Sequence, residues 1–142
     1  ETEVIHGLEW PDEARLAQLR ALNERMRATV TQEDWSELPR LNREFHNALL
    51  TLSPFQLIVD EIRRLFTLAD PFFAAKFERP SARLKTVEEH DQTIEALQRQ
   101  DRESLLAAMQ AHRNSNVEGL SQTMAGQRGV ATAPWDAARA QS

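Results

Sequence analysis

The sequence predicts an all-α fold, an antiparallel bundle of about six helices joined by short loops. Three observations lead to this prediction. The chain of 142 residues has only four glycines. The alternation of apolar and polar residues that marks strands is nearly absent, and apolar residues instead recur at spacings of three and four, the period of an amphipathic helix. The length suits one domain with a single hydrophobic core.

Proline and capping residues mark where the first two helices are expected to begin. The segment Pro11-Asp12-Glu13 places proline and acids in a first turn, and a leucine stripe follows to about Thr29. Asp34 with Glu37 three residues later fits a capping box, so we expect the second helix to start near Asp34.

Three further helices follow in the sequence. Ser53-Pro54 opens the third, whose expected inward residues are Ile58, Ile62, Leu65, Phe66 and Ala69. Pro71 is expected to kink or end it, because proline lacks the N–H that a helix interior needs. A fourth helix is expected from about Ser81 to Gln98, and a last one from Asp101 onward.

The domain organisation follows from this pattern. Residues 1–11 are expected to be an N-terminal stub or tail, residues 12–125 one helical domain, and residues 126–142, rich in Ala, Gly, Thr and Ser, a flexible C-terminal tail. Because residue 1 is Glu rather than Met, we expect the chain to be part of a longer protein.

Composition excludes several classes of protein. The absence of cysteine rules out disulfides and thiolate metal sites, so any metal must have nitrogen and oxygen ligands. The net charge of −5, with basic residues interleaved among acids, does not fit a DNA-binding surface. No apolar run approaches the length needed to span a bilayer and no signal peptide is recognisable, so a cytoplasmic protein without a membrane partner is expected.

Three histidines fall where a plain core would be apolar. On a helical wheel, His90 lies within the inward stripe of the fourth helix and His112 within that of the last helix. His46 lies at the flank of the second helix's apolar arc, with Asn42 one turn earlier. Buried imidazoles need partners, and one divalent metal would satisfy all three together. The residues alone leave this reading open beside that of hydrogen-bonded core histidines.

An effector pocket would need polar side chains near the histidines. Asn116 shares the face of His112 at i+4, Arg83 lies two turns before His90, and Arg63 flanks the apolar arc of the third helix. An arginine can clamp a carboxylate through two hydrogen bonds. The alternatives are a core hydrogen bond for Asn116 and plain solvation for both arginines.

Two sequence elements resemble a known family. The segment Asn42–Leu49 resembles the D/N-x-x-F-H-x-x-L element of the C-terminal ligand-binding (FCD) domain of FadR-subfamily GntR-type transcription regulators. Glu89–Leu97 resembles the E-H-x-x-I-x-x-A-L element of that family, and Asp101 with Ala108–His112 resembles its closing element. The resemblance covers roughly residues 12–125.

The resemblance implies a homodimeric bundle with a central metal and effector cavity. It implies zinc, nickel or manganese held by Asn42, His46, His90 and His112, and a small carboxylate effector at or beside the metal. DNA would be bound only through an N-terminal winged helix-turn-helix that this chain lacks. Many family members have Asp at the position of Asn42, so we expect a site without an anionic ligand, which favours an anionic effector.

Two other functions compete with effector sensing. A metal-dependent hydrolase could use the same three histidines, but it would need a general base. Glu89 is predicted to point away from the site and Asp91 to be peripheral, so we expect no enzyme. A purely structural helical interaction module is the second alternative.

Overall fold

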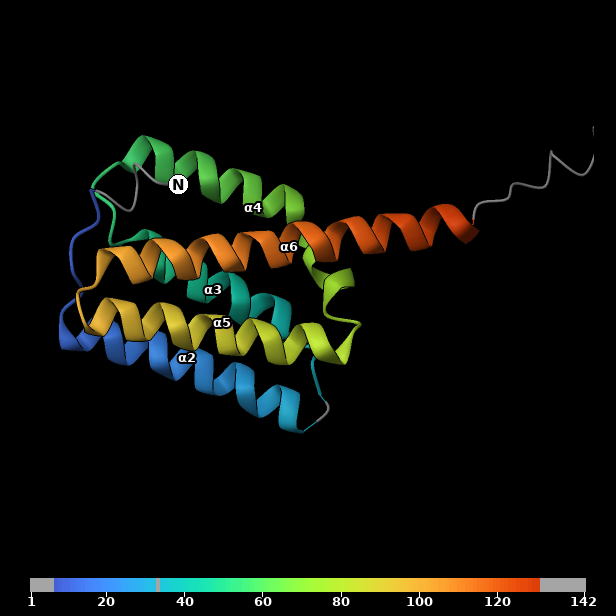
Figure 1. Ribbon diagram of the computed structural model, residues 1–142, viewed down its shortest axis with the longest axis horizontal. Coiled ribbons are helices and arrows are strands. Elements are labelled where there is room, and N and C mark those ends of the chain that lie inside the picture. The colour runs from blue at the N-terminus through green and yellow to red at the C-terminus, as the bar shows by residue number, and fades with distance from the viewer. Residues whose placement is uncertain (1–6, 33, 131–142) are drawn as a thin grey trace, which may run out of the picture.

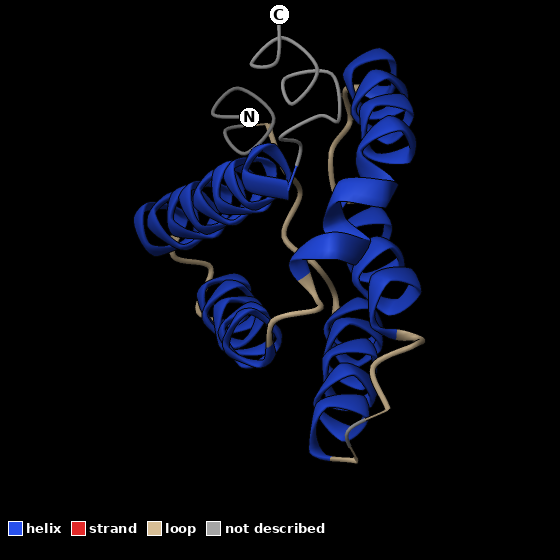
Figure 2. Ribbon diagram, turned by 90° about the vertical axis from the view of Figure 1, so that its right-hand side faces the viewer, coloured by secondary structure: helices blue, strands red, loops and turns tan. Residues whose placement is uncertain are grey.

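The predicted all-α bundle is confirmed by a computed structural model that describes residues 7–32 and 34–130 (Figure 1). No strand occurs in this described part of the chain (Figure 2). The helices are α2 (Glu13–Thr31), α3 (Leu38–Leu50), α4 (Gln56–Lys76), α5 (Pro80–Gln98) and α6 (Arg102–Val130). No helix among these residues is long and apolar enough to cross a membrane.

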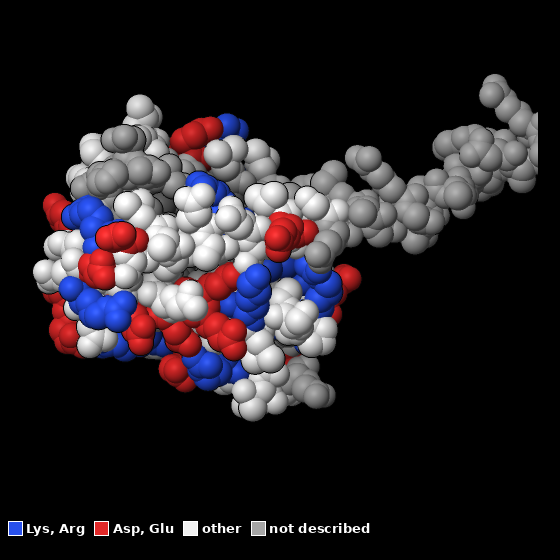
Figure 3. All heavy atoms as spheres, viewed as in Figure 1, with Lys and Arg blue, Asp and Glu red and all other residues white. Residues whose placement is uncertain are grey.

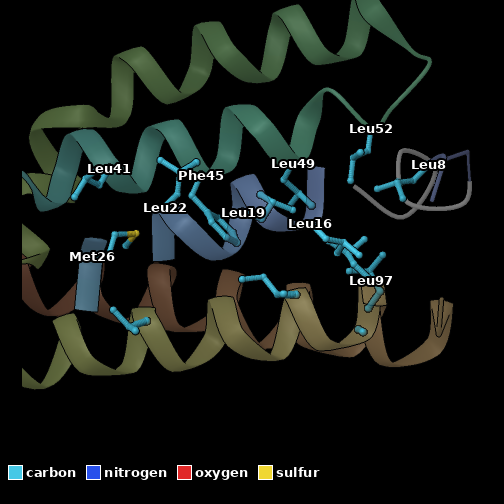
Figure 4. Close-up of a cluster of buried hydrophobic side chains, with 14 of the residues drawn as sticks. Leu8, Leu16, Leu19, Leu22, Met26, Leu41, Phe45, Leu49, Leu52 and Leu97 are labelled. Atoms are coloured by element: carbon cyan, nitrogen blue, oxygen red, sulfur yellow. The ribbon is translucent and has the colours of Figure 1, made fainter. Parts of the chain in front are cut away.

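The helices enclose one hydrophobic core. Helix α2 packs against α3 and α5, α5 packs against α6, and α4 lies on α6 and α3. Side chains from several of these helices meet between the ribbons in Figure 4, including Leu19, Met26, Leu41, Phe45 and Leu97. Because α5 is covered on one side by α2 and on another by α6, it buries more of its circumference than a surface helix does.

Local capping explains two of the helix starts. Asp12 caps α2 by accepting a hydrogen bond from the backbone N–H of Arg15 at 2.8 Å. Asp101 does the same for α6 through the backbone N–H of Ser104 at 3.1 Å. Both starts lie where the sequence predicts them.

Helix α3 starts later than predicted. Its N-cap is Glu37, which makes no side-chain capping bond, and proline occupies its first turn. Asp34 instead accepts hydrogen bonds from the backbone N–H and the hydroxyl of Ser36, which closes a local turn. The capping-box prediction was wrong because Pro39 is tolerated only in the first turn of a helix, and this position sets the start at Leu38.

Two predicted boundaries also move. Helix α4 does not end at Pro71 but continues to Lys76. A proline removes one intrahelical hydrogen bond, and packing of α4 against α6 offsets that loss. Helix α6 continues past Gly126 to Val130, into the segment predicted as a tail, while residues 131–142, like residues 1–6, lie outside the described residues.

The apolar stripe of α4 is less buried than predicted. Ile58 and Leu65 were expected to face inward, yet both are exposed, as are Leu57 and Leu68, whereas Val59 is fully buried. The prediction assumed a single apolar arc facing a core. Apolar residues surround more of α4 than α3 and α6 cover.

Candidate metal centre

Three histidines from three helices meet inside the bundle. His46 comes from α3, His90 from α5 and His112 from α6. One nitrogen of each ring lies within 4.8 Å of the nitrogens of the other two, and the ring centroids are 5.0 to 5.2 Å apart. The sequence-predicted histidines are therefore brought together.

The environment of His90 distinguishes this cluster from an ordinary polar core. Its side chain is 1% exposed and its ring stacks on Phe45 with the centroids 3.8 Å apart. Both Nδ1 and Nε2 are buried and have no hydrogen-bond partner in the described part of the chain. A buried polar atom without a partner is costly, and a metal bound to one of these nitrogens would offset part of that cost.

Asn42 provides a candidate oxygen donor. It is buried on α3, one turn before His46, and its Oδ1 has no hydrogen-bond partner among the described residues. Unsatisfied imidazole nitrogens together with an amide oxygen fit a divalent transition metal, since such metals accept nitrogen and oxygen ligands.

Glu89 sets the tautomer of His112. Its Oε2 accepts a hydrogen bond from Nδ1 of His112 at 2.7 Å, which leaves Nε2 of His112 with its lone pair facing Nε2 of His46 at 3.2 Å. A carboxylate that holds the outer nitrogen of a histidine is the usual support of a metal-ligating imidazole.

The prediction that Glu89 points away was therefore wrong. The helical wheel assumed one inward face for α5, but Glu89 is buried on the side of α5 that faces α6. Glu89 is not one of the predicted ligands, but it brings a negative charge beside them. Burial raises the pKa of Glu89, but hydrogen bonds from His112 and Ser115 outweigh this effect, so its pKa lies below the ordinary value and the carboxylate is charged.

Two of the clustered histidines, His46 and His90, are held neutral. Burial lowers the pKa of His46 and of His90 well below 6.5, and the neighbouring imidazoles and Lys76 add to the effect. At neutral pH both rings keep the lone pairs that a metal requires.

Lys76 is a buried cation that the sequence analysis missed. It is 5% exposed, and its Nζ donates to Oγ1 of Thr86 at 3.0 Å and to Oδ1 of Asn116 at 2.6 Å. Burial lowers the pKa of Lys76 to about 8, and the charge of Glu89 opposes only part of this shift. The expectation that α4 kinks or ends at Pro71 concealed this residue, because it did not extend an inward face to position 76.

Comparison with known proteins agrees with this geometry. Residues 9–115 match the family described as FCD domain, and this span contains Asn42 and all three clustered histidines. The chain belongs to the FCD family. FCD domains are the C-terminal effector-binding domains of GntR-family regulators of the FadR subfamily. No curated protein and no solved structure gives a significant match.

Family membership settles the question of an enzyme. FCD domains are regulatory ligand-binding domains and not enzymes. Within this FCD domain, Asp91 is engaged on the side facing α2, where its carboxylate accepts hydrogen bonds from Asn23 and Arg27. Basic and acidic side chains are interspersed over the face shown in Figure 3.

The three predicted effector contacts, Asn116, Arg83 and Arg63, have different hydrogen-bond partners in the structure. Asn116 contacts Lys76, as described. Arg83 donates to the carbonyl oxygens of Phe77 and Glu78, and its guanidinium lies over the ring of Trp35. Arg63 donates to Asp60 at 3.3 Å on the surface. Each arginine therefore finds acceptors close to it in the chain, and contact of either one with an effector stays a prediction.

Proposed function

We propose that this FCD domain binds a divalent transition metal on His46, His90 and His112 and uses it to sense a small organic acid. The observation that carries the proposal is His90, whose two ring nitrogens are buried without a partner inside a cluster of three imidazoles. Asn42 is the proposed oxygen ligand. An imidazole-rich set suits zinc or nickel better than manganese.

The residues of the chain prepare the site for a cation. Glu89 holds the proton on Nδ1 of His112, and Phe45 fixes the ring plane of His90 by stacking. A bound metal would supply the positive charge and the open coordination positions that attract a carboxylate. The charged Lys76 beside Asn116 adds to that attraction.

The signal would pass to DNA through other parts of the regulator. We propose that the domain, spanning residues 12–125, forms a homodimer in the cytoplasm, and that residues 1–11 and 126–142 serve as flanking segments. DNA would be contacted only by a winged helix-turn-helix outside this chain. Effector binding would favour one arrangement of the metal-bearing helices over another.

Elemental analysis tests the metal site directly. The protein is purified without an affinity column that carries metal, and its content of zinc, nickel and manganese is measured. We expect about one ion per chain. The variant His90→Ala should lose it, whereas His6→Ala, which alters the remaining histidine of the sequence, should retain it. A metal content near zero that none of these three ions restores would leave only the structural interaction module.

Effector binding is tested on the same protein. Thermal stabilisation is screened with short carboxylic acids, dicarboxylates and sugar acids, before and after metal removal. Stabilisation that requires the metal supports sensing at this site. Stabilisation by DNA instead of by acids would contradict the proposal.

A further inference from the structure

A pocket lies beside the histidine cluster, between the end of α4, the start of α5 and the middle of α6. It has a volume of about 180 Å³ and is lined by Lys76, Arg79, Ser81, Ala82, Lys85, Ser115, Glu118 and Gly119. Among the described lining residues three are cations and one, Glu118, is an acid. The pocket therefore carries an excess of positive charge.

The chemistry of the lining suits an oxyanion. Lys76 has three N–H donors, of which Thr86 and Asn116 accept two, so one remains for a ligand oxygen. Ser81 and Ala82, in the first turn of α5, also line the pocket. The N-terminal end of this helix, which carries a partial positive charge, therefore lies beside the pocket. Carboxylate and phosphate groups are the ligands that such donors recognise.

Two polar side chains, Ser115 and Glu89, connect the pocket to the histidine cluster. Ser115 lines it and donates to Oε1 of Glu89, whose other oxygen holds His112. Lys85 lies 3.9 Å from the same carboxylate. A ligand that contacts Ser115 or Lys85 would therefore alter the hydrogen bonds that orient a histidine of the cluster.

Gly119 keeps the pocket open. A Cβ at this position would lie 3.0 Å from Nη2 of Arg79 and 3.3 Å from Cγ of Lys76. Both contacts are closer than ordinary van der Waals distances, so any larger residue would push the two cations from their places.

We propose that this pocket binds an oxyanion group, carboxylate or phosphate, that belongs to the effector and lies apart from the group beside the metal. The effector is then an acid with two anionic groups. The assignment of this oxyanion group to the effector rests on the proposed function, whereas the affinity of the pocket for anions does not.

The pocket is tested by NMR titration of the full chain in its metal-free form. Inorganic phosphate and acetate are added in separate arms, and the amide shifts of Ser115 and Gly119 are followed. Saturable shifts in either arm support the proposal, and the arm with the lower Kd identifies the favoured oxyanion. No saturable shift in either arm overturns it.

Charge variants separate this site from general attraction of anions. Lys85→Gln should weaken binding about threefold and Glu118→Gln should strengthen it by a similar factor, as expected for partly exposed charges. Arg64→Gln removes an exposed cation of α4 outside the pocket and should leave Kd unchanged. Equal effects of Lys85→Gln and Arg64→Gln would overturn the proposal.

A shape variant gives a second test. Gly119→Ala should weaken binding while keeping the fold, because alanine favours helix more than glycine does. Unchanged affinity in this variant would contradict the assigned pocket. Metal content is measured on the protein as purified, before the metal is removed for the titration, so absence of metal together with retained anion binding refutes the proposed function alone.

Discussion

At the scale of single residues, Glu89 keeps the proton of His112 on Nδ1 and so leaves Nε2 available for a metal. Its carboxylate is buried, charged and bonded to both His112 and Ser115. It also supplies the negative charge that the ligand set itself lacks. The candidate metal site therefore has two layers: the histidines would bind the cation, and the carboxylate of Glu89 fixes the protonation of His112.

Removing the charge of Glu89 should weaken metal binding. In Glu89→Gln the amide is a poorer acceptor for Nδ1–H of His112, so we expect affinity for zinc to fall about 10- to 100-fold. Competition with a chelating dye measures the change. Glu88→Gln, at the exposed neighbouring position, is the matched control and should behave as the unaltered protein. Equal zinc affinity in the two variants would show that Glu89 does not support the ligand.

Lys76 should make stability depend on alkaline pH. Its pKa is about 8 in the folded protein and 10.5 when unperturbed, so between these values the unfolded chain binds more protons. The contribution of Lys76 to the free energy of unfolding therefore rises as the pH increases from about 8 to about 10.5. Below pH 8 the cost of burying the ammonium is fully present.

Urea denaturation of metal-free protein at several pH values measures this dependence. Lys76→Met should remove the rise that Lys76 contributes, while Lys85→Met, at a more exposed lysine, should keep it. A rise of the same slope in Lys76→Met would assign the effect to another group.

At the scale of the helices, α4 differs from the others. Its neighbours are α3 and α6, and it leaves Leu57 85% and Leu68 62% exposed. An apolar face of this kind is what a dimer interface offers. The proposed homodimer would use it.

Charged substitutions on α4 should separate the subunits. We expect the double variant Leu57→Glu and Leu68→Glu to sediment as a monomer in analytical ultracentrifugation, because burying the new carboxylates in an interface is costly. Leu84→Glu on α5, where the leucine is 52% exposed, is the control and should remain dimeric. A double variant that stays dimeric would place the interface elsewhere.

The helices also show which features can be predicted from local sequence patterns and which cannot. The starts of α2 and α6 follow from Asp12 and Asp101, because a cap is a contact between residues three apart. The continuation of α4 past Pro71 does not follow from local rules, since packing on α6 offsets the lost hydrogen bond. Inward and outward faces are predictable only for helices covered on one side.

At the scale of the whole molecule, the metal should act as a structural brace between α3, α5 and α6. Metal that binds only the folded chain should raise the free energy of unfolding by about 2.7 kcal/mol at a free concentration of 100 Kd. Denaturation with and without a chelator measures this. His46→Ala should show no difference between the two conditions, and a metal response that persists in it would exclude His46 as a ligand.

Without metal, the buried and unpartnered nitrogens of His90 should lower the stability of the protein. We expect His90→Leu to be about 1–2 kcal/mol more stable than the unaltered protein in chelator, because it removes two buried nitrogens that have no partner in the described chain. It should be less stable than the unaltered protein once zinc is added. A destabilised variant in chelator would mean that His90 is satisfied without a metal.

The amino-acid sequence alone determined the helical class, the histidines on three separate helices and the family elements around them, because each is a pattern along one helix or one short segment. Only the tertiary structure decided that Glu89 supports His112 and that Lys76 lies buried beside Asn116. It also decided that Arg83 donates to the carbonyl oxygen of Glu78. The physical reason is that periodicity describes one helix at a time. Which flank of α5 meets α6, and which carbonyls lie near an arginine, depend on how the helices pack together.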